Sequence, residues 1–202
     1  MRIITLSREF GSGGRELGKR LSENLGIPCY DREIIRMIAE KHGFDEEYVS
    51  RVSEKSIQAA YPITIGKRFS ATPSYQTRQA IAIAVEQQKI IENFAKQGDC
   101  VIVGRCADIF LEEYRPFKIF VYASEHAKLE RCLGRTDENE NLTPAMMRRK
   151  MREIDKERAN LRSFHTGTKW GAKENYHLCI NTTDKEIKKT GSCCFRIHTA
   201  LV

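Results

Sequence analysis

Three glycines near the N-terminus have the spacing expected of a loop that binds phosphate. Gly11, Gly13 and Gly14 follow a short apolar run, and leucines then recur every fourth residue from Leu17. An order of strand, glycine-rich turn and helix brings backbone N–H groups and a helix N-terminus together around an anion. Glycine also lets the backbone approach a phosphate without a Cβ in the way. We therefore interpret residues 11–15 as a phosphate-binding loop.

The loop departs from the standard P-loop pattern, which is G-x-x-x-x-G-K-[ST]. When residues 11–13 are aligned with the end of that loop, Gly14 stands where the lysine belongs. Arg15 then stands where the hydroxyl residue belongs. Either Arg15 or Arg8, just before the loop, could supply the positive charge instead of the lysine.

A second glycine fingerprint fits the same residues only in part. The dinucleotide-binding pattern is G-x-G-x-x-G with an acidic residue about twenty positions later. Glu16 breaks the third glycine, although Asp31 stands at the acidic position counted from Gly11. A phosphate loop, a dinucleotide-binding turn and a turn that binds nothing are therefore three open readings of the loop alone.

A later helix carries an arginine among its apolar positions. Arg158 shares one helical face with four apolar residues, which are Met147, Met151, Ile154 and Leu161. An arginine among core positions needs an anionic partner. Asp155, three residues earlier, could pair with it across a helical turn. A bound phosphate oxygen is the other possibility, because a guanidinium binds phosphate oxygens bidentately.

Composition limits the classes of protein that the chain can represent. Its 202 residues are 41% hydrophobic and carry a net charge of +7. This length suits one α/β domain with an excursion or two, and the charge favours anionic partners. No apolar run approaches the length of a membrane span, and no apolar signal region begins the chain. The seven cysteines form no C-x-x-C pair, so we expect a reduced, cytoplasmic protein without a zinc site.

The elements that must position these residues alternate between strands and helices. Strands are predicted in the apolar run that begins at Ile3 and at residues 27–30, 100–103, 119–123 and 177–180. Strands separated by helical segments indicate βαβ units and a mainly parallel sheet. Ligands of such sheets bind beyond the C-terminal ends of the strands. The glycine loop stands at one of these ends.

Capping residues predict where several helices begin. Asp31, Asp45 and Thr143 are expected N-caps, and Pro144 would take the first position of the last helix. A longer helix is predicted from near Thr77 to Gln97. Two further interpretations concern the stretches 54–74, expected to be a long mobile loop, and 183–202, expected to be a terminal helix.

Taken together, these residues make the chain resemble the cytidylate kinase-like family of P-loop nucleoside monophosphate kinases. The resemblance extends from Ile3 to about Lys189, and its segments occur in the family's order. They are SREFGSGGRE at 7–16, YDREII at 30–35, VGRCAD at 103–108, IDKERA at 154–159 and TGTKWG at 166–171. The resemblance implies an α/β, P-loop kinase-type three-layer sandwich with a five-stranded parallel sheet. Residues 1–202 would form one domain, with an acceptor-binding excursion at about 31–76 and a helical lid at about 131–165.

The resemblance also implies a role for individual residues. Those expected to hold the donor nucleotide are Gly11, Ser12, Gly13, Gly14 and Arg15. Those expected to face the acceptor are Asp31, Arg36, Arg105 and Asp108, with Arg105 at the acceptor phosphate and Asp108 near the base or sugar. Those expected to act on the transferring group are Arg15, Arg131, Arg135, Asp155 and Arg158.

The implied activity is ATP-dependent phosphorylation of a nucleoside monophosphate such as CMP or dCMP, or of a related small acceptor. Cations would stabilise charge on the phosphoryl oxygens, and Mg²⁺ would bridge the donor phosphates, with Ser12 or a water-linked carboxylate as its ligand. The alternative is a non-catalytic nucleotide-binding regulatory module that has lost the P-loop lysine. A dinucleotide enzyme is disfavoured by Glu16. We expect a small-molecule nucleotide as partner and no membrane. We also expect no nucleic acid, because no aromatic stacking motif accompanies the basic helix.

Overall fold

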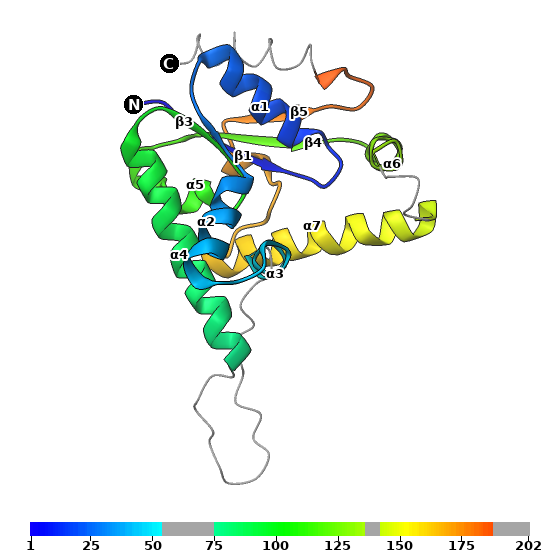
Figure 1. Cartoon of the computed structure of the whole chain (residues 1–202). Coiled ribbons are helices and arrows are strands. Elements are labelled where there is room, and N and C mark those ends of the chain that lie inside the picture. The colour runs from blue at the N-terminus through cyan, green and yellow to red at the C-terminus, as the bar shows by residue number, and fades with distance from the viewer. Residues whose placement is uncertain (54–74, 136–141, 188–202) are drawn as a thin grey trace.

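A five-stranded parallel sheet forms the centre of the computed structural model, which describes residues 1–53, 75–135 and 142–187 (Figure 1). The strands are β1 (Ile3–Arg8), β2 (Cys29–Tyr30), β3 (Cys100–Val103), β4 (Phe117–Tyr122) and β5 (Leu178–Asn181). They lie in the order β2-β3-β1-β4-β5, and every neighbouring pair is parallel. The predicted five-stranded parallel sheet is therefore confirmed, with β2 shorter than expected and β5 shifted by one residue.

Helices connect the strands and cover both faces of the sheet. They are α1 (Gly14–Leu25), α2 (Arg32–His42), α3 (Glu46–Ser53), α4 (Tyr75–Gln97), α5 (Ala107–Phe110), α6 (Glu125–Leu133) and α7 (Pro144–Thr166). Two short 3-10 helices, η1 (Glu112–Tyr114) and η2 (Lys173–Asn175), follow α5 and α7. Helix α4 begins two residues before the predicted Thr77 and ends at the predicted Gln97.

Alternate residues of the strands supply two cores on opposite faces. In β1, Ile4 and Leu6 pack with Leu17 of α1 in one core. Ile3 packs with residues of α2 and α4 in the other core, among them Ile38. This alternation follows from the two-residue period of a strand. Figure 1 shows the result as three layers, with α1 on one side of the sheet and α2, α4 and α7 on the other.

Two of the three predicted N-caps make side-chain capping hydrogen bonds. Asp45 Oδ1 accepts the backbone N–H of Glu47 at 2.8 Å, and Thr143 Oγ1 accepts that of Met146 at 3.3 Å. Asp31 also stands at the predicted N-cap position of α2, but its carboxylate makes no capping hydrogen bond. That carboxylate instead faces two arginines, which are described below.

Some expectations fall outside the described residues. These are the loop at 54–74 and nearly all of the terminal helix predicted at 183–202. Among the helices within the described ranges, none is long and apolar enough to cross a membrane.

Candidate active site

The glycine loop joins β1 to α1 and is closed on itself by hydrogen bonds. Ser12 donates its backbone N–H and its hydroxyl to Glu9 O, at 3.3 and 2.8 Å. Gly11 and Gly13 adopt positive φ angles of 76° and 80°, a conformation that glycine adopts without strain. Leu17 donates its N–H to Gly13 O at 3.0 Å, so the N–H groups of the turn before it have no acceptor within α1. The loop therefore presents backbone donors at a helix N-terminus, as an anion site requires.

A cavity of about 360 Å³ lies against this loop. Its walls include six cationic side chains, which are Arg8, Arg15, Arg131, Arg135, Lys150 and Arg158. Among the described residues that line it, Glu9 is the one carboxylate. Such a concentration of guanidinium groups binds a polyanion, because charge-assisted hydrogen bonds to phosphate are strong. Of the predicted donor residues, Gly11, Gly13, Gly14 and Arg15 line the cavity, whereas the buried Ser12 does not.

The cations of this cavity differ in how firmly they are held. Arg131 donates to the backbone oxygen of Thr182 and, at 3.2 Å, to its hydroxyl oxygen. Its Nη1 also lies 3.5 Å from Gly11 O, so Arg131 ties the loop to the end of β5. Arg135 is 61% exposed and pairs with Glu16 at 2.8 Å. Arg15 is also more than half exposed. The exposed side chains of Arg15 and Arg135 can reorient toward a ligand. Arg131 is instead fixed by its hydrogen bonds to Gly11 and Thr182.

Asp155 connects α7 to the loop. Its Oδ1 accepts the backbone N–H of Phe10 at 2.7 Å, and its Oδ2 lies 3.6 Å from the Lys128 ammonium. Burial raises the pKa of Asp155, against the Phe10 hydrogen bond and the charges of Arg158 and Lys128. Asp155 therefore acts on the loop backbone, and no contact of its own with the cavity is seen.

Arg158 makes the ion pair that was one of its two predicted options. Its Nη1 lies 3.6 Å from Asp155 Oδ1 and donates to the backbone oxygen of Arg8 at 3.1 Å. The side chain nevertheless lines the cavity. Pairing with Asp155 thus orients the guanidinium and leaves it in the cavity wall.

A smaller cavity of about 30 Å³ shares Arg8 and Arg158 with the first. Its other walls come from β1, α3, α7 and the turn after β3, and they include Ser53, Gly104, Arg105, Cys106, Asp108 and Arg162. Arg105 is 6% exposed and donates to Ser53 Oγ. Burial raises the pKa of Cys106 to about 12, so this thiol stays protonated near neutral pH and is not a nucleophile.

Asp108 and Arg162 form a buried ion pair in this second cavity. The Arg162 guanidinium also lies over the Tyr176 ring, 5.1 Å from its centroid, in a cation–π contact. Arg162 was not among the predicted site residues, although it follows Arg158 by four residues and so lies on the same helical face. Arg162 engages the carboxylate of Asp108 in this structure. The expected contact of Asp108 with a base or sugar stays a prediction.

Asp31 lies beside the first cavity as a bridge between two cations. Its carboxylate pairs with Arg15 and lies 3.6 Å from Arg8 Nη2. Arg36, in contrast, is not brought to the site. It is 61% exposed, lies near Glu40 and lines neither cavity. The apolar residues on the other face of α2 point Arg36 away from the molecule.

The residues that the structure describes do not fit a magnesium site built by the protein. Ser12, the expected ligand, uses its hydroxyl as a donor to Glu9 O and is fully buried. The Glu9 carboxylate is held by Lys128 at 2.9 Å. Across the described ranges no three His, Cys, Asp or Glu side chains gather as metal ligands. We therefore assign no step to a metal ion.

Solved structures share this fold at low sequence identity. An uncharacterized protein from Eubacterium ventriosum ATCC 27560 matches with 23% identity and a TM-score of 0.69, covering 98% of both chains. A shikimate kinase from Bacteroides thetaiotaomicron matches with 13% identity and a TM-score of 0.60, also covering 98% of both chains. A shikimate kinase from Acinetobacter baumannii, in complex with shikimate, matches with 16% identity and a TM-score of 0.58, covering 99% of this chain and 94% of its own. These structures establish a P-loop kinase fold.

The model of one protein family matches nearly the whole described chain. No protein of curated function matches the sequence. The model of the cytidylate kinase-like family matches residues 3–184. This range includes the glycine loop, both cavities and all five strands. The chain belongs to the cytidylate kinase-like family.

Proposed function

We propose that the protein transfers the γ-phosphoryl group of ATP to a nucleoside monophosphate such as CMP or dCMP, or to a related small acceptor. One observation carries this proposal: a cation-rich cavity over the glycine loop shares Arg8 and Arg158 with a second cavity that contains buried Arg105 and Arg162. Two neighbouring anion-binding cavities with a common cationic wall would suit a transfer of phosphate from one ligand to the other. In this proposal, residues of about 31–76 bind the acceptor and residues of about 131–165 form a lid within one domain.

The donor would bind in the larger cavity. Its phosphates would accept hydrogen bonds from the N–H groups of the glycine loop at the start of α1. Arg15 and Arg135, both largely exposed, would turn toward the phosphate tail. Arg135 is held at the rim by an exposed ion pair with Glu16, which is weak and easily exchanged. Arg15 pairs with the largely buried Asp31, and its own side chain is more than half exposed.

Transfer would occur at the wall that both cavities share. An oxygen of the acceptor phosphate attacks the γ-phosphorus, and the bond from that phosphorus to the β–γ bridging oxygen breaks, releasing ADP. An ionised acceptor phosphate needs no general base. The Arg158 guanidinium would stabilise charge on the equatorial oxygens, which is the main contribution of a protein to phosphoryl transfer.

The acceptor remains the least restricted part of the proposal. The family supports a nucleoside monophosphate. One fold neighbour holds shikimate, a small acceptor with hydroxyl groups and a carboxylate. The buried cation Arg105 of the smaller cavity suits either anion, so both classes belong in the test.

A non-catalytic nucleotide-binding module is the second candidate. It is favoured by Gly14 in the place of the P-loop lysine and by the burial of Ser12, which withdraws the hydroxyl near the loop. Such a module would bind ATP in the larger cavity and would not release ADP in the presence of any acceptor.

A coupled ADP-release assay separates the two candidates. The wild type is incubated with Mg·ATP and, in turn, CMP, dCMP, UMP, AMP, GMP and shikimate, beside a titration of ATP binding. Acceptor-dependent ADP release that falls at least about tenfold in Arg158→Met supports the kinase. Arg149→Met removes one charge from the exposed face of α7 and is the matched control. ATP binding without turnover on any acceptor supports the module, and absence of ATP binding rejects both.

A further inference from the structure

Arg8 stands at a position that a standard P-loop gives to glycine. In G-x-x-x-x-G-K-[ST] the first glycine precedes the lysine by six residues. With Gly14 at the lysine position, that first glycine corresponds to residue 8. This chain therefore has a long cation where the standard loop has glycine, and glycine where the standard loop has a long cation.

The two positions are next to each other in space. A Cβ placed on Gly14 would lie 2.5 Å from Arg8 Cβ and 3.0 Å from Arg8 Cγ. These atoms belong to the stem of the arginine, near its backbone, and cannot move aside as the end of a flexible side chain could. A lysine at position 14 and an arginine at position 8 thus exclude each other, because close-packed interiors do not tolerate such overlaps.

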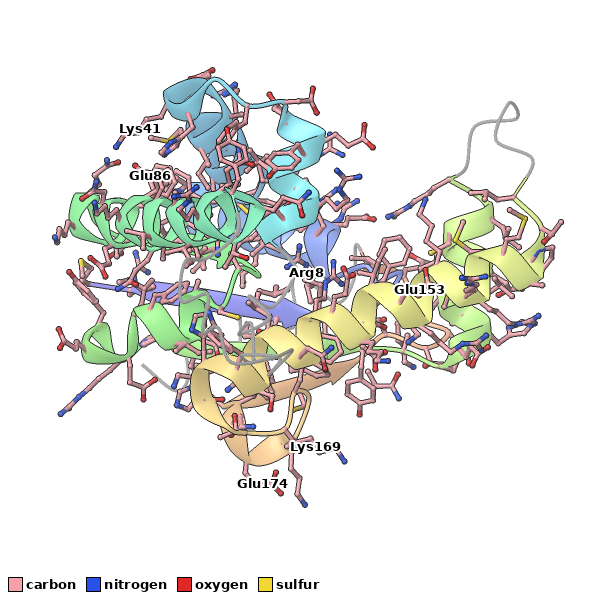
Figure 2. The ribbon with its side chains drawn as sticks, turned by 90° about the horizontal axis from the view of Figure 1, so that it is seen from below. Arg8, Lys41, Glu86, Glu153, Lys169 and Glu174 are labelled. Atoms are coloured by element: carbon pink, nitrogen blue, oxygen red, sulfur yellow. The ribbon has the colours of Figure 1, made fainter. Side chains whose placement is uncertain are left out.

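The far end of Arg8 is also enclosed. A Cβ on Gly104, the residue after β3, would lie 1.5 Å from Arg8 Nη1. Arg8 Nη2 lies 3.6 Å from Asp31 Oδ1, and the residue is 8% exposed. Figure 2 shows Arg8 in the region between α7 and the helices α3 and α4. Gly14 and Gly104 therefore make room for one extended side chain along the floor of the site.

Arg8 lines both cavities. We propose that Arg8 supplies the phosphate-binding cation that Gly14 cannot, so that the loop has exchanged the positions of its glycine and its cation. Asp31 holds the guanidinium at the wall common to donor and acceptor. This inference rests on the proposed function for the phosphate that Arg8 contacts, but the mutual exclusion of residues 8 and 14 does not depend on it.

A double-mutant cycle tests the exclusion without any ligand. Thermal unfolding is measured for the wild type, Gly14→Lys, Arg8→Gly and the double variant. Gly14→Lys lowers the melting temperature by about 5–10 °C in the wild type, as overpacking does, and by no more than about 2 °C when Arg8 is already glycine. Gly134→Lys is the matched control, since residue 134 has a negative φ of −70° and room for a Cβ. An equal loss in both backgrounds overturns the exclusion.

ATP titrations test the role of the cation. Arg8→Met, which keeps most of the side-chain volume, lowers the affinity at least about tenfold, as expected for a charge-assisted hydrogen bond. Arg149→Met on the exposed face of α7 changes it less than twofold. The double variant Arg8→Gly/Gly14→Lys binds ATP at least tenfold more tightly than Arg8→Gly. If Arg8→Met binds ATP as tightly as Arg149→Met, the role of Arg8 is rejected. If the wild type itself binds no ATP, the proposed function fails, and the melting cycle alone decides the exclusion.

Discussion

Asp155 Oδ1 lies 2.7 Å from the backbone nitrogen of Phe10 and accepts its N–H, although 145 residues separate the two in sequence. This bond connects the middle of α7 to the residue just before the glycine loop. The resemblance had implied that Asp155 acts on the transferring group. That role stays a prediction; in this structure Asp155 bonds to the backbone next to the loop and lies 3.6 Å from Arg158 Nη1.

We predict that Asp155→Ala weakens ATP binding about tenfold and lowers the free energy of unfolding by about 1–3 kcal/mol, because the Phe10 N–H loses its acceptor in a partly buried site. Asp155→Asn should retain most of both properties, since its amide oxygen accepts the same hydrogen bond. Isothermal titration with ATP and urea unfolding measure the two quantities. Equal losses in the two variants would show that the charge of Asp155, rather than this hydrogen bond, is what matters.

The pH dependence of stability gives a separate test of Asp155. Burial raises its folded-state pKa above the ordinary value of 3.8. At a pH between the unfolded-state pKa of Asp155 and its higher folded-state pKa, the folded protein binds a proton that the unfolded chain does not. The resulting stabilisation is fully present below the unfolded pKa and is lost as the pH rises through the folded pKa. Asp155→Asn lacks this titration, so its stability relative to the wild type should increase from about pH 4 upward. Urea unfolding across that range measures the difference, and two parallel curves would contradict the raised pKa.

The buried pair of Asp108 and Arg162 predicts an asymmetric mutational response. Arg162→Met leaves the Asp108 carboxylate, 3% exposed, without its cation. We expect a loss of about 3–5 kcal/mol in the free energy of unfolding, because an unpaired buried charge is costly. The double variant Asp108→Asn/Arg162→Met removes both charges and should recover at least half of that loss. Urea unfolding measures both variants, and additive losses would show that the two side chains do not interact.

Local patterns predicted the parts of the fold that depend on nearby residues. The apolar run at 100–103 became β3 with all four residues buried, and the glycine turn became the start of α1. The same logic placed Asp31 at the start of α2 but did not predict the partners of its carboxylate. A capping residue is recognised by its neighbours in sequence, whereas the carboxylate of Asp31 is drawn to Arg8, which only the folding of β1 beside β3 brings close.

The sequence indicated which segments form the candidate site. It did not indicate which partner each arginine of the site would contact. The spacing of Gly11, Gly13 and Gly14 indicated the loop, and the helical face of Arg158 indicated its inward orientation. Nothing local indicates that Arg131 would bond to residue 182, or that Arg162 would pair with a carboxylate 54 residues away. Such pairs depend on the meeting of separate elements at the C-terminal edge of the sheet.

Substitutions of Arg131 and Arg135, the two arginines near the end of α6, should differ in their effect on stability. Arg131 donates to backbone oxygens on two segments, so Arg131→Met should cost about 1–3 kcal/mol in the free energy of unfolding, because those acceptors lose their partner. Arg135 makes an exposed ion pair with Glu16, so Arg135→Met should cost less than about 1 kcal/mol.

ATP binding is expected to depend on Arg135, although its substitution costs little stability. Arg135 can leave Glu16 for a phosphate, and Arg135→Met should weaken ATP binding about tenfold while AMP binding changes little, since AMP lacks the outer phosphates. Glu16→Gln frees Arg135 from its ion pair and should strengthen ATP binding by a small factor. Titrations of ATP and AMP against Arg135→Met, Glu16→Gln and the wild type measure these effects. An equal loss for ATP and AMP in Arg135→Met would place its guanidinium at the nucleoside end of the ligand and not at the phosphate tail.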